Sequence, residues 1–140
     1  MKYRVYDTKE KCWITDSVYM APNGELYEVK KSFFGSTKFV ALDENRYVYH
    51  IDIDLYDKNN ILVLEGDYIK AVVDMDNEDD ERKTVIGVVA YVHELAGYVI
   101  LCDETEEFYM LGSDVSEFIE VIGNVFDGIN EDEQDGYESL

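Results

Sequence analysis

The alternation of apolar and polar positions predicts short β-strands along most of this 140-residue chain. Residues 61–73 contain two apolar runs separated by Glu65-Gly66-Asp67, where glycine permits the positive φ of a sharp turn. Residues 84–92 are apolar on both faces, which is typical of a central strand. Gly87 within that run indicates a bulge or a close approach of another backbone. We therefore expect the last sheet of a barrel-like domain to begin in this region.

Two hairpin patterns precede this region. Asn23-Gly24 is a dipeptide that supplies the two positive φ values of a type I′ turn, so we expect a two-residue hairpin loop there. Residues 32–42 fit either a strand pair or a packed loop. Residues 46–56 alternate cleanly, which predicts one buried and one solvent-facing side. The paired runs of the hairpins are residues 3–6 with 12–14 and residues 18–20 with 26–29.

The strand pattern continues after residue 92, with one interruption. Ser113 or Asp114 is placed to cap a single helical turn that ends at Phe118. The strands expected around it are residues 98–102, 108–111 and 119–126, the last of the chain. Together the elements predict an all-β fold of antiparallel hairpins with at most one short helix. In this fold the C-terminal half forms a small SH3-like or partly open barrel.

Charge is distributed unevenly along the chain, which carries 12 basic and 32 acidic residues for a net charge of −20. Residues 1–60 have 9 basic and 10 acidic side chains, which leaves 3 basic and 22 acidic for residues 61–140. An acidic surface repels phosphate backbones and anionic membranes, so we expect no direct binding of nucleic acid and no membrane binding. The same field attracts a basic protein and speeds the encounter.

The chain is expected to form a single β-rich domain over residues 1–126. Within it, residues 1–60 form a neutral, tyrosine-rich hairpin part and residues 61–126 an acidic, barrel-like part. Residues 127–140 are acidic and poor in apolar side chains, so we expect a disordered tail. No apolar run approaches the ~20 residues of a membrane span, and the first residues lack a signal segment, which predicts a cytoplasmic location.

Motifs that would carry chemistry are not found. A calcium loop starting at Asp74 would have Asp79 where glycine is required and Val85 where glutamate is required. The chain contains no phosphate-binding glycine loop and no nucleophile elbow. His50 and His93 are the only histidines, and neither has a second ligand at metal-binding spacing. We therefore expect no enzymatic activity, no metal and no cofactor.

Five segments spread over residues 3–126 carry a resemblance to a known family. They are YRVYDTKEKCWITD, PNGELY, LYDKNNILVLEGDYIK, GVVAY and FIEVIGNVF. The chain resembles the YopX family of phage and prophage proteins. It departs from that family in having Asn59-Asn60 where Asn-Gly is common, and in its acidic tail. The resemblance implies a β-rich fold, a phage or prophage origin and self-association as a homo-oligomer, but no catalytic residues.

The first hypothesis for function is a non-enzymatic phage accessory protein that acts by protein–protein interaction. Its acidic part would bind a basic host protein, either by imitating the phosphate spacing of nucleic acid or as an inhibitor of a host or defence factor. Carboxylates in two acidic segments are the predicted contacts. They are Asp74, Asp76, Glu78, Asp79, Asp80, Glu81, Glu104, Glu106 and Glu107.

Two further hypotheses belong to other classes. One is an oligomer that binds and sequesters a nucleotide-like small molecule, which requires local positive charge. The basic side chains available for it in the neutral part are Arg4, Lys30, Lys31, Lys38 and Arg46. The other is a structural or assembly protein that forms a stable oligomer without either kind of ligand.

Overall fold

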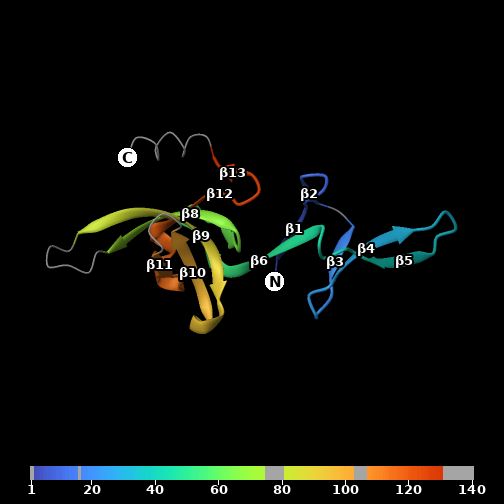
Figure 1. Ribbon diagram of the computed structural model, residues 1–140, viewed down its shortest axis with the longest axis horizontal. Helices are drawn as coiled ribbons and strands as arrows, with labels where there is room; N and C mark the ends of the chain where they lie inside the picture. Colours follow the sequence, from blue (N-terminus) through green and yellow to red (C-terminus); the bar gives the residue numbers. More distant parts are fainter. Residues whose placement is uncertain (1, 16, 75–80, 103–106, 131–140) are drawn as a thin grey trace. The chain divides into compact units, whose positions relative to one another are not determined.

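Two compact units make up the chain, which we term the N-terminal unit (residues 2–51) and the C-terminal unit (residues 52–140). Strand β6 (Tyr47–Tyr56) contributes its first half to the former and its second half to the latter. All strand pairs are antiparallel, and the fold is all-β, as the sequence predicts (Figure 1). The structure, a computed structural model, describes residues 2–15, 17–74, 81–102 and 107–130.

The N-terminal unit contains two small sheets. In one sheet, β1 lies between β2 and the first half of β6, and the other sheet has the order β3-β4-β5. The hydroxyl of Tyr3 donates a hydrogen bond to the carbonyl of Val18 at 3.1 Å and so connects the two sheets. The strands are β1 (Tyr3–Asp7), β2 (Cys12–Ile14), β3 (Val18–Met20), β4 (Leu26–Lys31) and β5 (Thr37–Ala41).

The turn between β3 and β4 is not the predicted type I′ turn. Gly24 has a φ of 87°, but Asn23 is not among the residues with positive φ. The amide of Gly24 donates to the carbonyl of Ala21 at 2.9 Å, which makes Pro22 and Asn23 the central residues. Proline suits the first central position of a type I turn because its φ is already near −65°. The result is a three-residue loop in which glycine follows a type I turn.

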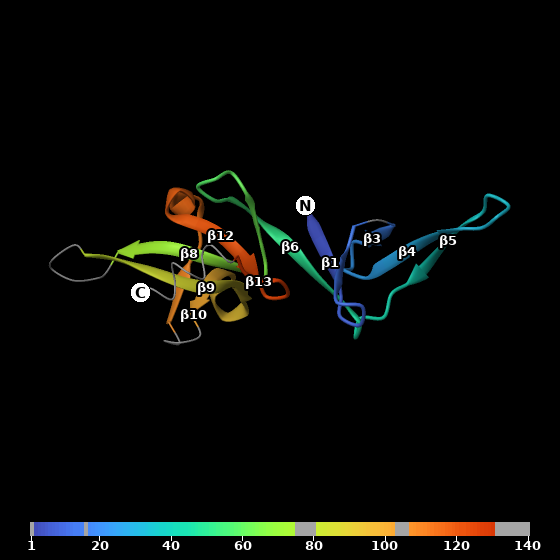
Figure 2. The same ribbon diagram turned by 90° about the horizontal axis from the view of Figure 1, so that it is seen from above.

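Residues 32–42 form a turn followed by one strand, β5, so they are neither a strand pair of their own nor a packed loop. β4 continues to Lys31 and pairs with β5 through a turn centred on Phe33 and Phe34. The amide of Gly35 donates to the carbonyl of Ser32 at 3.0 Å, and Gly35 has a φ of 83°. The turn thus has the same construction as the one before β4. In both views this hairpin extends away from β1 of the same unit (Figures 1 and 2).

The C-terminal unit is built on a six-stranded antiparallel sheet with the order β11-β10-β9-β8-β12-β13. This sheet curves into a half barrel, and its long strands β8 and β9 run side by side in both views (Figures 1 and 2). The elements are β7 (Leu62–Leu64), β8 (Asp67–Asp74), β9 (Arg82–Val92), η1 (His93–Leu95), β10 (Gly97–Cys102), β11 (Glu107–Met110), η2 (Ser113–Phe118), β12 (Ile119–Asn124) and β13 (Gly128–Ile129).

An apolar core fills the concave side of this half barrel. Ile69, Val89, Ile100 and Ile119 come from four different strands of the sheet and are at most 2% exposed. The second half of β6 and β7 complete the cluster, and Val115 of η2 packs against it. The predicted barrel-like architecture of the C-terminal half is confirmed, with Gly66 (φ 79°) at the predicted turn before β8.

Gly87 confirms the predicted close backbone approach in the central strand β9. A Cβ atom at this position would lie 2.4 Å from the carbonyl oxygen of Leu101 and 2.5 Å from the side chain of Ile100. The register of β9 with β8 is continuous through Gly87, whereas its paired residues with β10 end at Val88. The absence of a side chain lets β9 and β10 approach each other at this point.

Asp57 connects the turn before β7 to strand β12. Its carboxylate is 3% exposed, and Oδ1 accepts the amides of Asn59 at 2.9 Å and Ile61 at 2.8 Å. Oδ2 accepts the amide of Val121 at 2.9 Å. Three backbone donors therefore satisfy one buried carboxylate, and the turn that composition predicts here is also a structural link.

Two predictions near the C-terminus are wrong. Neither Ser113 nor Asp114 is the N-cap of η2, because that position is occupied by Gly112, which has no side chain to bond the first turn. β12 ends at Asn124, and the chain then reverses because the side-chain oxygen of Asn124 accepts the amides of Phe126 and Asp127. The last strand is therefore β13, which pairs with the end of β12. Of the predicted tail, residues 131–140 lie outside the described residues.

Candidate interaction surfaces

The predicted acidic contacts lie at the ends of strands in the C-terminal unit. Asp74, Glu81 and Glu107 are described, and all three are exposed. Asp74 lies opposite Arg82 at the end of the β8–β9 pair, and Glu107 begins β11 opposite the end of β10. Because β8 and β10 run in the same direction, these positions are at the same end of the sheet. The remaining predicted contacts, Asp76, Glu78, Asp79, Asp80, Glu104 and Glu106, lie outside the described residues.

Two basic side chains at the start of β9 partly neutralise this end of the sheet. Arg82 Nε lies 3.1 Å from Asp74 Oδ1, and Lys83 Nζ lies 3.1 Å from Glu107 Oε2. The hydroxyl of Tyr109 also donates to Glu107 Oε2 at 2.6 Å. Hydrogen bonds from Tyr109 and then Lys83 lower the pKa of Glu107. Exposed pairs of this kind contribute little to stability, so their main effect is on local charge.

The division into two units sharpens the charge asymmetry of the chain. Residues 2–51 carry 8 basic and 7 acidic side chains, whereas residues 52–140 carry 4 basic and 25 acidic side chains. The N-terminal unit therefore has a net charge of +1 and the C-terminal unit a net charge of −21. Almost the entire net charge of the protein therefore comes from residues 52–140.

Arg46 is engaged in an ion pair with the buried carboxylate of Asp7 and does not carry a free charge. Its Nε and Nη2 atoms donate to the two oxygens of Asp7 at 2.8 and 2.7 Å, and Asp7 is 3% exposed. The bond from Arg46 is the largest influence on Asp7, and the amides of Glu10 and Lys9 add to it. Together they lower the pKa of Asp7 to about 2. Arg46 is therefore committed to holding β1 against the start of β6.

Arg4 is likewise part of a side-chain cluster on β1, β2 and β6. Its Nε donates to Nδ1 of His50 at 3.4 Å, and its guanidinium lies 4.8 Å from the centre of the Trp13 ring. Burial, followed by the positive charge of Arg4, lowers the pKa of His50 to about 4. His50 is therefore neutral at physiological pH and serves as the acceptor for Arg4. This geometry is that of a packed structural histidine.

The three lysines considered for a nucleotide site all lie on the β4–β5 pair, which we term the basic hairpin (residues 26–41). Lys30 and Lys38 are directly opposite each other across the two strands, and Lys31 is next to Lys30. Phe33 and Phe34 in the connecting turn are 98% and 93% exposed. Sequence reasoning did not assign a role to these phenylalanines. The signal that it missed is an aromatic pair between turn-forming serines, with lysines on both sides.

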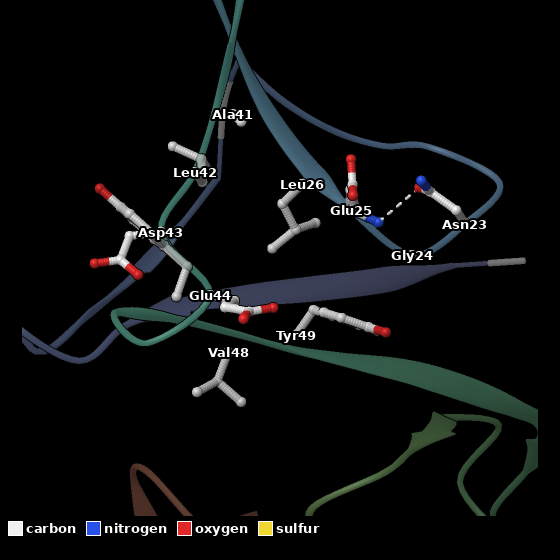
Figure 3. A pocket seen from close by; sticks show the side chains of 11 residues that line it. Asn23, Gly24, Glu25, Leu26, Ala41, Leu42, Asp43, Glu44, Val48 and Tyr49 are labelled. Atoms are coloured by element: carbon white, nitrogen blue, oxygen red, sulfur yellow. Dashed lines mark hydrogen bonds between the residues drawn. The ribbon is translucent and has the colours of Figure 1, made fainter.

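A pocket of about 680 Å³ lies elsewhere in the N-terminal unit (Figure 3). It is formed by the turn before β4, the connection from β5 to β6 and the start of β6, with Leu26, Val48 and Tyr49 among its lining residues. The side chains of Glu25, Asp43 and Glu44 also line it, whereas its lining residues, all of them described, include no lysine or arginine. Such a pocket suits a cationic or hydroxyl-bearing ligand and repels a nucleotide.

Neither a metal site nor a membrane-spanning helix is found among the described residues. No group of three His, Cys, Asp or Glu side chains in this part of the chain is arranged to hold a metal ion. His93 lies in η1 with its ring 6.4 Å from that of Tyr91, in a different unit from His50. No helix within the described ranges is long and apolar enough to cross a membrane.

The fold defines the class of the protein as an all-β protein of two hairpin-rich units, one of them a half barrel. The chain has the fold of the yopX protein from Bacillus subtilis, whose crystal structure it matches with a TM-score of 0.53 at 16% identity, over 89% of this chain and 91% of that one. Protein EF1440 from Enterococcus faecalis matches with a TM-score of 0.47 at 19% identity, over 89% and 92%. The YopX resemblance is thus confirmed at the level of the fold. Scans against protein-family models and against curated proteins found no match.

Proposed function

We propose that the protein is a non-enzymatic binding protein whose C-terminal unit docks on a basic surface of another protein. The concentration of charge in that unit, −21 against +1 for the N-terminal unit, is the observation that carries the proposal. The proposal includes a phage or prophage origin, which the resemblance to the YopX family implies, and action as an accessory protein in the cytoplasm of a bacterial host. A host protein that normally holds nucleic acid has the complementary surface.

The described geometry supports this proposal because different residues stabilise the half barrel and carry its surface charge. The half barrel is held by its apolar core and by the bonds of Asp57, so its exposed carboxylates are not needed to hold the strands together. Asp74, Glu81 and Glu107 are at one end of the sheet, where they add to one another's field. A concentrated field of one sign increases the rate of encounter with a partner of opposite sign and weakens as salt is added.

The test compares two variants with the same net charge. In the first variant, the six carboxylates among residues 74–81 are replaced by their amides. In the second, the six carboxylates of the N-terminal unit other than Asp7 are replaced in the same way. Each full-length protein is used to capture partners from a bacterial lysate at low and at high salt. We expect wild type and the second variant to capture the same salt-sensitive partner, and the first variant to lose it. Equal loss in both variants, or loss in neither, would contradict the proposal.

The acidic pocket of the N-terminal unit supports a second candidate, a small-molecule binder. Its volume of about 680 Å³ is in the range of ligand sites, but its three carboxylates change the expected ligand from a nucleotide to an organic cation. The melting temperature of the full chain distinguishes a cationic ligand from a nucleotide. A ligand that binds only the folded state raises the melting temperature of the protein as the ligand concentration increases. Spermidine is the probe and ATP the comparison. A shift with spermidine that Glu44→Gln weakens supports this candidate, and a shift with ATP alone overturns it.

A further inference from the structure

The tip of the basic hairpin presents an apolar surface that no described residue covers. Phe33 and Phe34 are 98% and 93% exposed, and their rings meet edge to face with centroids 5.6 Å apart. Each phenylalanine side chain offers roughly 150–200 Å² of apolar area, so the pair forms one contiguous patch. Scattered single apolar residues are normal on protein surfaces, but a contiguous exposed patch marks a contact site.

Several polar groups of Ser32, Gly35 and Ser36 in this tip are paired with one another. The amide of Ser32 donates to the carbonyl of Ser36 at 2.8 Å, and the amide of Gly35 donates to the carbonyl of Ser32 at 3.0 Å. The amide of Ser36 donates to the hydroxyl oxygen of Ser32, and the two serine hydroxyls bond each other. A polar group that keeps a partner costs far less to transfer out of water than an unpaired one. These hydrogen bonds therefore lower the cost of moving the tip into an apolar medium.

Positive charge lies directly behind the aromatic pair. Lys30 and Lys38 are opposite each other in the register, an arrangement of like charges that destabilises a strand pair. Within the described part of the chain, neither they nor Lys31 forms an ion pair. Glu28 is the one acidic residue of the hairpin, which therefore has a net charge of +2. An anion between the two strands' lysines would remove their repulsion.

We propose that the basic hairpin docks the protein on an anionic lipid membrane. Phe33 and Phe34 enter the boundary between headgroups and acyl chains, and Lys30, Lys31 and Lys38 contact the lipid phosphates. The spacing fits this arrangement, because the lysines are two to four residues from the nearer phenylalanine along the strands. At ~3.3 Å per residue this is roughly 7–13 Å, comparable with the depth of about 5–10 Å at which interfacial segments sit.

A membrane explains this combination better than a protein pocket or a nucleic acid. A bilayer accepts two adjacent rings in any orientation and needs no complementary shape, and it supplies the phosphate charge at the same time. Nucleic acid would also meet the lysines, but the hydrogen bonds within the turn favour only the entry of the tip into an apolar medium. The expectation of no membrane contact rests on the charge of the whole chain, and that charge belongs to the C-terminal unit. The hairpin itself has the opposite sign.

The test is co-sedimentation of the full chain with vesicles. Vesicles of phosphatidylglycerol mixed with phosphatidylcholine are compared with vesicles of phosphatidylcholine alone. We expect binding to the anionic vesicles only, weak and reversible, and reduced by salt. The double variant F33S/F34S should weaken binding to the anionic vesicles about tenfold or more. K30S/K31S should weaken it about tenfold, because each lysine near the surface contributes roughly 1 kcal/mol before screening by salt. Both pairs are exposed, so thermal unfolding should be unchanged.

Matched variants in other parts of the chain provide the control. Phe108 is 50% exposed on β11, and Phe108→Ser removes an exposed ring outside the hairpin. K9S/K11N removes two exposed lysines from the turn between β1 and β2. Both variants should bind vesicles as wild type does. Equal binding by F33S/F34S and wild type, or equal binding to neutral vesicles, overturns the proposal. It is also overturned if wild type ignores vesicles while F33S/F34S abolishes self-association or binding to an oligonucleotide.

Discussion

The N-terminal and C-terminal units hold their strands together with different kinds of interaction. In the C-terminal unit, eight buried side chains form a continuous core, and most of the acidic residues that the structure describes there are exposed. In the N-terminal unit, few side chains are fully buried, and one of them is the carboxylate of Asp7 in its ion pair with Arg46. Stability in the first case comes from apolar area, whereas in the second case it depends on polar pairs. The exposed carboxylates of the C-terminal unit are therefore available for the proposed binding of a basic protein.

The largest expected effect comes from truncating the core of the C-terminal unit. Ile69→Ala removes a side chain that is fully buried and should lower the free energy of unfolding by about 3–4 kcal/mol. Urea unfolding followed by circular dichroism reports on both units, and fluorescence of Trp13, the single tryptophan, reports on the N-terminal unit. Val72→Ala on the same strand is the control, because Val72 is 41% exposed. Equal shifts by the two probes would show that the units unfold as one.

Removal of the Asp57 carboxylate should have the next largest effect. Asp57→Ala leaves three backbone amide donors without their acceptor and should destabilise the C-terminal unit by about 2–4 kcal/mol. Asp57→Asn keeps one oxygen for the turn amides and loses the acceptor for Val121, so its effect should be intermediate. Circular dichroism during urea unfolding measures both. Indistinguishable unfolding of Asp57→Ala and wild type would show that the link to β12 is not needed.

The N-terminal unit should be the more sensitive to mild acid, through His50. The pKa of His50 is about 4 in the folded protein against 6.5 for a free side chain, so the unfolded state binds the proton first as pH falls. The stability that neutral His50 contributes is fully present above pH 6.5 and is lost between about pH 6.5 and 4. The loss is on the order of 1–2 kcal/mol after solvent screening. Trp13 fluorescence should show this dependence, and His50→Gln should flatten it. An NMR titration with a midpoint near 6.5 would contradict it.

The smallest effect is expected from the exposed pairs at the acidic end of the sheet. Lys83→Met breaks the contact with Glu107 and should leave the melting temperature nearly unchanged, because exposed pairs contribute little to stability. The same change makes the net charge more negative, so salt-sensitive capture of a basic partner should become stronger. Lys58→Met is the control, because it removes the same charge from a pair elsewhere in the unit, that of Lys58 with Glu120. A large fall in melting temperature would mean that the pair is structural.

Strand positions were predictable from the sequence because apolar alternation and glycine placement are local signals. The turn at Gly66 and the close approach at Gly87 are both readable in this way. The turn before β4 was misjudged because Pro22 shifts the central positions by one residue. The local structure of residues 32–42 could not be predicted from the sequence. Phe33 and Phe34 are apolar, which ordinarily predicts burial, but they are exposed in the structure.

The candidate sites were less predictable than the fold. Composition located the negative charge, but the pairing of Arg82 with Asp74 and of Lys83 with Glu107 depends on strand register. The basic residues proposed for a nucleotide site are scattered by the fold, since Arg46 joins Asp7 and Arg4 joins His50. A local sequence pattern contains no information about partners so distant along the chain.

Position 87 sets a limit on how this chain can vary. Gly66 has a positive φ, which favours glycine and which asparagine adopts at modest cost. Gly87 has no such conformational requirement, and its restriction is purely one of space, because even a methyl group would overlap the carbonyl of Leu101. In a library of single substitutions selected for folding, codons for every other amino acid should therefore be depleted at this position, alanine included.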